Sequence, residues 1–335
     1  MLHRLPTLFM FGRNTVPEVA VQGMVALREA GGGTFSNAAT SMQFVTRSLL
    51  KPWQFIASDI GSRESFWAVG FASHSAQPAH LDALKALSDK AGAGEADLIC
   101  PRSWPLDPLT STAMRMRGDI QTRMFHPCSG KHLMMLAACR QHDYPLSNYF
   151  SPDHPLQKRI YNLVGREASE RLEWFTDSCG LPVAAMSVDG YLGLWEKLAR
   201  SSEPRVIDLK ELWLANPRLV GGVKRLDSDL MEAFPNRILA KEGADGLLVL
   251  QTLPGRSGGS AGGSGNGNEP SATCFVKVSA GYNPAHLGLA LTSLLHQKSR
   301  TGPLTQTLSE LMDYLQSRQE EWVPRDQNLM LPPFT

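Results

Sequence analysis

Segments with strand-like composition lie near both ends of the chain, and this distribution most constrains how the chain can fold. Residues 19–27 and 34–45 are rich in apolar and β-branched side chains and are separated by three glycines at 31–33, a pattern typical of a hairpin. Residues 237–253 and 272–281 have the same character. Because hairpin strands run antiparallel, the sequence predicts an antiparallel sheet that both ends of the chain build.

The remaining stretches favour helices. Apolar residues recur at helical spacing in residues 79–92, 155–172, 191–201, 284–297 and 303–316. An antiparallel sheet flanked by helices is an α+β fold, and a chain of 335 residues is long enough to bury one large core. We therefore predict a single α+β domain over residues 1–335.

Residues 256–271 have the low-complexity sequence RSGGSAGGSGNGNEPS. Segments rich in glycine and serine are flexible. Since this one joins two strand-like stretches, we interpret it as a long hairpin loop inside the domain. Such a loop is tolerated because each doubling of loop length adds only about 0.6 kcal/mol of closure entropy.

The balance of charged residues, the lengths of the apolar runs and the cysteine content indicate which kinds of partner this chain can bind. The chain has 33 basic and 32 acidic residues, so we expect no basic surface for nucleic acid or for an anionic membrane. No stretch approaches the run of about 18 apolar residues that indicates a membrane helix. Five scattered cysteines without a signal-peptide pattern predict reduced thiols. We expect a soluble, cytoplasmic protein whose partner is a small molecule.

Ser48 and Lys51 stand three residues apart in the sequence TRSLLKPWQ. Pro52 restricts the backbone of Lys51, which predicts a first helical turn or a 3₁₀ turn with both side chains on one side. A serine becomes a nucleophile when a neighbouring base takes its proton, and a lysine kept neutral by burial can do this. The pair is a candidate nucleophile and base, although an exposed turn gives the same pattern.

Ser73 and Lys241 are weaker candidates. Ser73 and His74 follow an apolar stretch and precede a predicted helix, where a serine is most often an N-cap. Lys241 follows the apolar residues 238–240, where a lysine usually marks the end of a strand. Neither segment establishes a function by itself.

Cys128 and Lys131 lie at an apparent helix start, within the sequence HPCSGKH. Backbone N–H groups at such a start favour a thiolate, and a thiolate with a neutral amine can form half of a zinc site. Cys179, two residues after Asp177, can bring a second sulfur. This spacing matches no standard zinc motif, so a buried thiol beside a surface lysine is the alternative.

Read together and in order, these segments resemble the rhizobial-type L-asparaginases (asparaginase II), a cysteine-containing family. The resemblance runs from about Val16 to Leu295. The motifs that carry it are Ser-x-x-Lys-Pro-x-Gln at 48–54, Ala-Ser-His at 72–74, Cys-Ser-Gly-Lys-His at 128–132, Pro-Asp-His-Pro-Leu-Gln at 152–157, Asp-x-Cys at 177–179, RLDSDLM at 225–231 and AKEGADG at 240–246.

The resemblance implies a fold similar to serine β-lactamases and penicillin-binding proteins, in a homodimer. It also implies a set of site residues. The catalytic pairs are Ser48 with Lys51 and Ser73 with Lys241; the zinc ligands are Cys128, Lys131 and Cys179; the substrate-binding residues are Arg47, His132 and Asp177.

The implied reaction is hydrolysis of L-asparagine to L-aspartate and ammonia through an acyl-enzyme. A neutral lysine takes the proton of a serine, and the second Ser-Lys pair moves protons and stabilises the oxyanion. The sequence leaves open which serine is the nucleophile. We favour Ser48 because local geometry fixes its lysine.

The sequence also departs from the family. Val19 and Val21 replace a serine and a histidine, Ala76-Gln77 replaces Gly-Glu, and residues 125–127 read Phe-His-Pro in place of His-Asn-Asn. Because buried polar groups set substrate selectivity, two alternatives stay open. One is a related amidase or glutaminase with shifted specificity, and the other is a catalytically impaired relative that binds zinc or a ligand.

Overall fold

The computed structural model describes residues 5–61, 64–254, 269–279 and 283–334. The chain divides into two compact units. We call them the sheet unit (Met1–Gln43, Ser187–Arg200 and Ala233–Thr335) and the helical unit (Phe44–Met186 and Ser201–Glu232). Of the site residues predicted from the sequence, only Lys241 belongs to the sheet unit.

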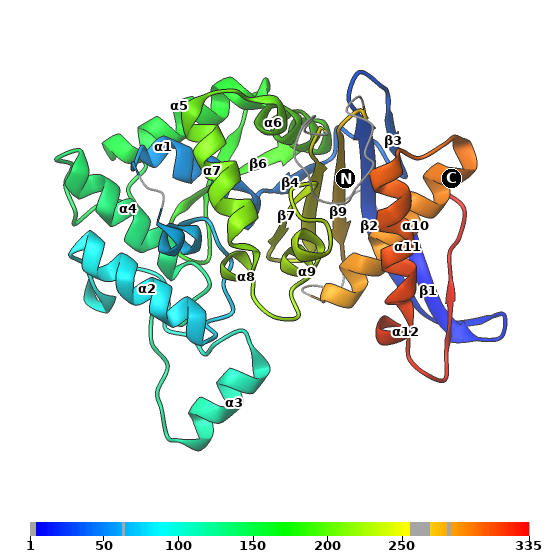
Figure 1. The fold of residues 1–335 in the computed structure, drawn as a ribbon, viewed down its shortest axis with the longest axis horizontal. Helices are drawn as coiled ribbons and strands as arrows, with labels where there is room; N and C mark the ends of the chain where they lie inside the picture. Colours follow the sequence, from blue (N-terminus) through cyan, green and yellow to red (C-terminus); the bar gives the residue numbers. More distant parts are fainter. Residues whose placement is uncertain (1–4, 62–63, 255–268, 280–282, 335) are drawn as a thin grey trace. The chain divides into compact units, whose positions relative to one another are not determined.

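The sheet unit contains a seven-stranded sheet in the order β10-β1-β2-β9-β8-β7, with β3 paired to β2 (Figure 1). Strand β1 pairs antiparallel with β10 and β2, β2 with β3 and β9, and β8 with β7 and β9. The strands are β1 (Thr7–Arg13), β2 (Val16–Glu29), β3 (Thr34–Ser36), β7 (Ile238–Gly243), β8 (Leu247–Thr252), β9 (Ala272–Val278) and β10 (Asn328–Met330).

The centre of the sheet is apolar on both faces. All residues of β8 and all but Lys277 of its neighbour β9 are buried. Helices α6 (Val188–Arg200) and α10 (Pro284–Thr301) pack on strands β2 and β9. The chain continues through α11 (Gln306–Ser317), which packs against α10, and the short α12 (Gln319–Trp322).

The helical unit is built around α4 (Ser129–Gln141), which is buried from Ser129 to Cys139. Helix α4 packs against α1, α2, α5 and the 3₁₀ helix η2. Gly130 permits the approach to η2, since a Cβ atom there would lie 2.2 Å from the carbonyl oxygen of Val69. The start of α4, with its predicted site residues, is therefore held in the core of the unit.

Figure 1 shows the other elements of the helical unit. A three-stranded sheet has the order β4-β6-β5. The elements are β4 (Gln43–Val45), η1 (Arg47–Leu50), α1 (Lys51–Ser58), η2 (Ser65–Gly70), α2 (Pro78–Ala91), η3 (Glu95–Asp97), α3 (Pro108–Met116), α5 (Pro155–Ala168), β5 (Glu173–Thr176), β6 (Pro182–Ser187), α7 (Pro204–Ala215), α8 (Pro217–Val220) and α9 (Leu226–Ala233).

The structure confirms the predicted α+β class. The five predicted helices appear as α2, α5, α6, α10 and α11. The expected antiparallel pairs β2-β3 and β8-β9 form, and the stretch 237–253 itself folds into the two paired strands β7 and β8. The closer likeness to serine β-lactamases and the single-domain organisation stay predictions. Most of the predicted flexible loop, residues 256–268, lies outside the described residues.

One strand prediction is wrong. Residues 34–45 form two short strands, β3 and β4, which belong to different sheets. Asn37 interrupts the stretch because its side chain accepts a hydrogen bond from Val25 N and donates one to Gly23 O. Asn37 N still donates to Val25 O at 3.2 Å, but the acceptor for Val25 N is the side chain of Asn37, where a continuing strand would offer a backbone carbonyl.

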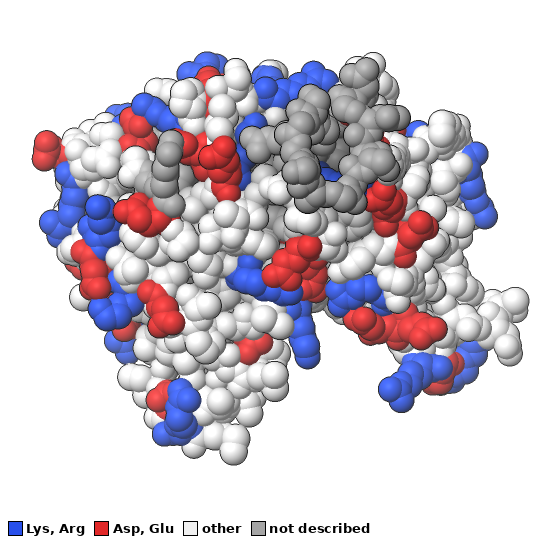
Figure 2. Space-filling view, in the orientation of Figure 1, with Lys and Arg blue, Asp and Glu red and all other residues white. Residues whose placement is uncertain are grey.

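The surface is consistent with the balanced composition. Figure 2 shows basic and acidic side chains interspersed over the displayed face. Within the described residues, no helix is both long enough and apolar enough to cross a membrane.

Candidate active site

The first Ser-Lys pair lies at the junction of η1 and α1. Ser48 belongs to the 3₁₀ helix, as predicted, and Lys51 N donates a hydrogen bond to Ser48 O. Pro52 occupies the first turn of α1, where its missing N–H group is harmless. Arg47 has a left-handed backbone with φ of 48°, which is uncommon for a side chain of this size. The local sequence thus holds Ser48 and Lys51 on a sharply turned segment.

Lys51 contacts Ser73. Its side chain is fully buried, and its Nζ atom makes hydrogen bonds with Ala72 O and Pro127 O, the latter at 3.2 Å, and with Ser73 Oγ at 3.4 Å. Within the part of the chain that the structure describes, the Ser48 hydroxyl makes no hydrogen bond. In this structure the hydroxyl that contacts Lys51 is therefore that of Ser73, whereas the sequence paired Lys51 with Ser48.

The surroundings of Lys51 suit a neutral amine. A neutral amine has two hydrogens and one lone pair, and the carbonyls of Ala72 and Pro127 can only accept. A protonated Lys51 donates to all three groups; in the neutral form, with both hydrogens donated to the carbonyls, the lone pair is left for the hydroxyl of Ser73. Burial lowers the pKa of Lys51, although the nearby Cys128 thiol raises it.

Backbone pairing holds the segment that carries Ser73. Ser73 N donates to Val220 O at 2.9 Å, and Ser75 N donates to Gly221 O at 3.1 Å. The side chain of Arg225 also holds this segment, because its Nη1 atom donates to Ser73 O at 3.2 Å. These bonds fix the position from which the Ser73 hydroxyl meets Lys51.

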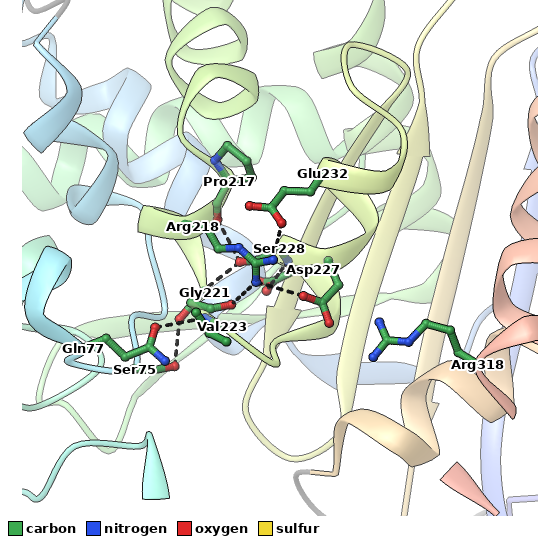
Figure 3. Close-up of polar contacts among 12 residues, drawn as sticks. Ser75, Gln77, Pro217, Arg218, Gly221, Val223, Asp227, Ser228, Glu232 and Arg318 are labelled. Atoms are coloured by element: carbon green, nitrogen blue, oxygen red, sulfur yellow. Dashed lines mark hydrogen bonds and ion pairs between the residues drawn. The ribbon is translucent and has the colours of Figure 1, made fainter. Parts of the chain in front are cut away.

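The loop that holds Ser73, residues 217–228, is itself cross-linked (Figure 3). Ser75 Oγ donates to Gly221 O at 2.8 Å, and Gln77 Oε1 accepts from Val223 N at 2.9 Å. Ser228 Oγ donates to Pro217 O and accepts from Gly222 N. The loop is therefore a rigid support for the segment of residues 73–77.

His74 is buried next to Ser73 and has one unused acceptor. Its Nε2 atom lies 2.9 Å from Ser129 Oγ, which donates its own hydrogen to Met124 O. His74 Nε2 must therefore carry the hydrogen, and Nδ1 is a bare acceptor. Nδ1 is buried and has no hydrogen-bond partner among the described residues.

Two thiols and an amine converge as predicted. Lys131 Nζ donates to Cys179 Sγ at 3.3 Å, and Cys128 and Cys179 shift the pKa of each other. The neighbouring Cys179 lowers the pKa of Cys128, against the effect of burial, and the neighbouring Cys128 raises the pKa of Cys179. All three side chains are buried. The cluster is a thiolate stabilised by a thiol and a lysine.

The donor types of this cluster suit zinc, which prefers thiolates and tolerates nitrogen. Within the described residues, no group of three or more His, Cys, Asp and Glu side chains is arranged to hold a metal. Lys131 would therefore have to be the third ligand. For that it must lose a proton, whereas the neighbouring sulfur atoms of Cys179 and Cys128 raise its pKa over the opposing effect of burial. A bound dication would reverse that balance.

Arg47 and Asp177, two predicted substrate-binding residues, form an ion pair. Arg47 Nη1 lies 2.5 Å from Asp177 Oδ1. Asp177 also accepts from Ser178 N at 2.8 Å, and Gly180 in the same turn has a left-handed φ of 86°. The turn that presents Cys179 is thereby tied to the segment that carries Ser48.

The third predicted substrate-binding residue, His132, is fully buried on α4. Its Nδ1 atom lies 2.7 Å from Tyr149 Oη. Its Nε2 atom is buried without a hydrogen-bond partner in the described part of the chain. Burial lowers the pKa of His132 well below the usual range, with a further contribution from Lys131.

Lys241 lies in the sheet unit, on β7, where it is fully buried and Nζ donates to Glu242 O at 3.0 Å. Its pairing with Ser73 stays a prediction.

The sequence analysis did not identify three residues that support the site, namely Ser129, Tyr149 and Arg225. Ser129 and Arg225 stand inside recognised motifs, whereas Tyr149 carries no sequence signal.

Comparison with known proteins agrees with the sequence resemblance. The L-asparaginase II family profile matches residues 10–323. No curated protein matches the chain at a significant level. A solved Bacillus subtilis glutaminase, in a covalent complex with 5-oxo-L-norleucine formed by reaction with 6-diazo-5-oxo-L-norleucine, aligns with 90% of this chain and 88% of its own, at 12% identity and a TM-score of 0.35.

Proposed function

Because the chain belongs to the L-asparaginase II family, and is therefore a hydrolase of linear amide C–N bonds, we propose that its substrate is L-asparagine. The products are L-aspartate and ammonia. The observation that carries the proposed mechanism is the contact between the buried amine of Lys51 and the hydroxyl of Ser73.

Lys51 acts as the base in this proposal. The neutral amine takes the proton of Ser73, whose oxygen attacks the amide carbon of the substrate. The resulting ammonium returns that proton to the departing nitrogen, and ammonia leaves. Water then cleaves the acyl-enzyme: Lys51 takes a proton from the attacking water and passes it to the departing oxygen of Ser73, which restores both groups. The carbonyls of Ala72 and Pro127 orient Lys51 in both steps.

The nucleophile assignment differs from the preference that local sequence geometry suggested. Ser48 is closest to Lys51 in sequence, but only the Ser73 hydroxyl is hydrogen-bonded to the Lys51 amine. The contact therefore favours Ser73. Ser48 remains the competing nucleophile and is tested alongside it.

In this proposal Cys128, Lys131 and Cys179 hold zinc. When bound, the metal supplies a positive charge that can orient an oxygen of the substrate. Arg47 and Asp177 contact the charged groups of the amino acid, because a guanidinium binds carboxylates and a carboxylate binds ammonium groups. As in the resembling family, we expect a homodimer.

Ammonia release tests the proposal. Wild type, Ser73→Ala and Ser48→Ala are assayed with asparagine, glutamine and a panel of small amides. Release from asparagine that disappears in Ser73→Ala supports the proposal. Release from glutamine or another amide alone would replace asparagine with a shifted substrate, and no release from any amide would indicate an impaired, ligand-binding relative.

A further inference from the structure

Tyr149 has no role in the function proposed above, yet its hydroxyl is hydrogen-bonded to His132, a residue of the candidate site. We propose that Tyr149 is a positioning residue that fixes His132 in one tautomer, so that His132 Nε2–H is a donor for an oxygen atom of the substrate. The substrate part of this inference rests on the proposed function, whereas the tautomer does not.

The hydroxyl of Tyr149 takes part in two hydrogen bonds, one with a backbone N–H group and one with His132. It lies 3.3 Å from Ile99 N, a backbone group that can only donate, and 2.7 Å from His132 Nδ1. The Tyr149 side chain is buried, and no other hydrogen-bond partner of its hydroxyl occurs among the described residues. Burial also raises the pKa of Tyr149, so the hydroxyl keeps its proton.

These contacts determine where the protons lie. A tyrosine hydroxyl has one hydrogen and can accept further hydrogen bonds. Ile99 N–H occupies an acceptor position, so the single hydrogen of the hydroxyl is available for His132 Nδ1. Nδ1 then accepts, and in a neutral imidazole the hydrogen must sit on Nε2.

The other protonation states leave more groups unsatisfied. If Nδ1 carried the hydrogen, the Tyr149 hydroxyl would have no acceptor for its own hydrogen. A doubly protonated ring would add a buried cation without any carboxylate among its contacts. Buried polar groups without partners are strongly disfavoured.

The support for Tyr149 is rigid. Gln157 Nε2 donates to Tyr149 O at 2.8 Å, and His154 connects the start of α5 to the same loop by donating to Pro145 O. The rings of Tyr149 and His132 meet edge to face at 5.7 Å and 87°. The Pro-Asp-His-Pro-Leu-Gln motif at 152–157, to which the reaction assigns no chemistry, thus holds the tyrosine that orients His132.

What remains is His132 Nε2, a buried N–H group for which the described residues offer no hydrogen-bond partner. Such a group is satisfied when a ligand brings an acceptor. A carboxamide or α-carboxylate offers oxygen atoms that can only accept. A neutral imidazole held in this tautomer would bind such an oxygen and would reject a ligand that places an N–H group there.

Nuclear magnetic resonance of histidine-selective ¹⁵N-labelled protein tests the tautomer directly. The chain has nine histidines, and a His132→Gln variant assigns the resonance. We expect His132 as the pure Nε2–H form in wild type, and a mixture of forms in Tyr149→Phe. Tyr144→Phe, which removes a hydroxyl outside the site, should leave the His132 signal unchanged. An Nδ1–H form in wild type, or an unchanged signal in Tyr149→Phe, would overturn the inference.

Kinetics test the connection to the substrate. For an enzyme active on an amide, we expect Tyr149→Phe to lower kcat/KM about tenfold or more, the usual effect of losing one well-placed hydrogen bond. Because Tyr149 acts through His132, the double variant with His132→Ala should be no slower than His132→Ala alone. Additive losses would indicate a merely structural tyrosine. Absence of all amidase activity would contradict the proposed function, while the nuclear magnetic resonance measurement would still determine the tautomer of His132.

Discussion

Gln77 connects the loop that holds Ser73 to helix α3. Its Oε1 atom accepts from Val223 N at 2.9 Å, and its Nε2 atom donates to Asp107 Oδ1 at 3.2 Å. The resembling family has glutamate at this position. A Gln77→Glu substitution would keep the acceptor for Val223 but would place a second carboxylate against Asp107, so we predict that it destabilises the protein.

The distance sets the magnitude. Two unit charges 3.2 Å apart repel by about 1 kcal/mol at the dielectric constant of water and by about 5 kcal/mol at an effective value of 20. Both side chains are partly exposed, so the lower end applies, and the lost hydrogen bond adds about 1 kcal/mol. We expect the free energy of unfolding to fall by about 2 kcal/mol at pH 7.

Denaturant unfolding measures this loss and can separate its two components. Gln77→Leu removes both hydrogen bonds without adding charge and is the matched control. Addition of Asp107→Asn to Gln77→Glu should recover most of the stability, since the new amide can donate. The repulsion raises the folded-state pKa of the carboxylate pair, so the charge component should disappear as the pH falls through that pKa. Equal stability of Gln77→Glu and wild type at pH 7 would refute the reasoning.

Three other perturbations have definite expected outcomes. Burial lowers the pKa of His80 to about 4; the unfolded chain therefore takes up a proton below about pH 6.5 that the folded chain does not, and stability should fall by about 3 kcal/mol between pH 6.5 and 4. His80→Gln should lose this dependence in unfolding curves recorded across that range. Gly222→Ala should destabilise by about 2 kcal/mol or more in denaturant unfolding, because φ is 123° and a Cβ atom would lie 2.7 Å from Gln77 Oε1; wild-type stability would contradict this. Cys179→Ser should lose zinc in metal analysis of purified protein while Cys274→Ala keeps it, and equal zinc content would contradict the ligand assignment.

Local sequence patterns predicted the elements well because their causes are local. Apolar spacing predicted helices such as α5 and α10, and glycines marked the β2-β3 turn. The failure at residues 34–45 has a non-local cause, since the side chain of Asn37 bonds to the backbone of β2. A composition typical of strands cannot show which partner a segment will find.

The sequence named the residues of the candidate site one by one, but it did not show which of them contact each other. The three-residue spacing of Ser48 and Lys51 predicted the 3₁₀ turn correctly, yet the amine of Lys51 is bonded to a hydroxyl 22 residues away. Tyr149 could not be identified because its role depends on one contact across the fold. Motifs show which chemistry is present, whereas pairing depends on how the segments pack.

The central claim is that Lys51 activates Ser73. A diazoketone analogue of asparagine, which alkylates the nucleophile of an amidohydrolase, would mark the reacting residue, and peptide mass spectrometry would locate the adduct. We expect an adduct on Ser73 that is absent in Ser73→Ala and formed about 10²–10⁴-fold more slowly in Lys51→Met. An adduct on Ser48, with Ser73→Ala labelled at the wild-type rate, would contradict it.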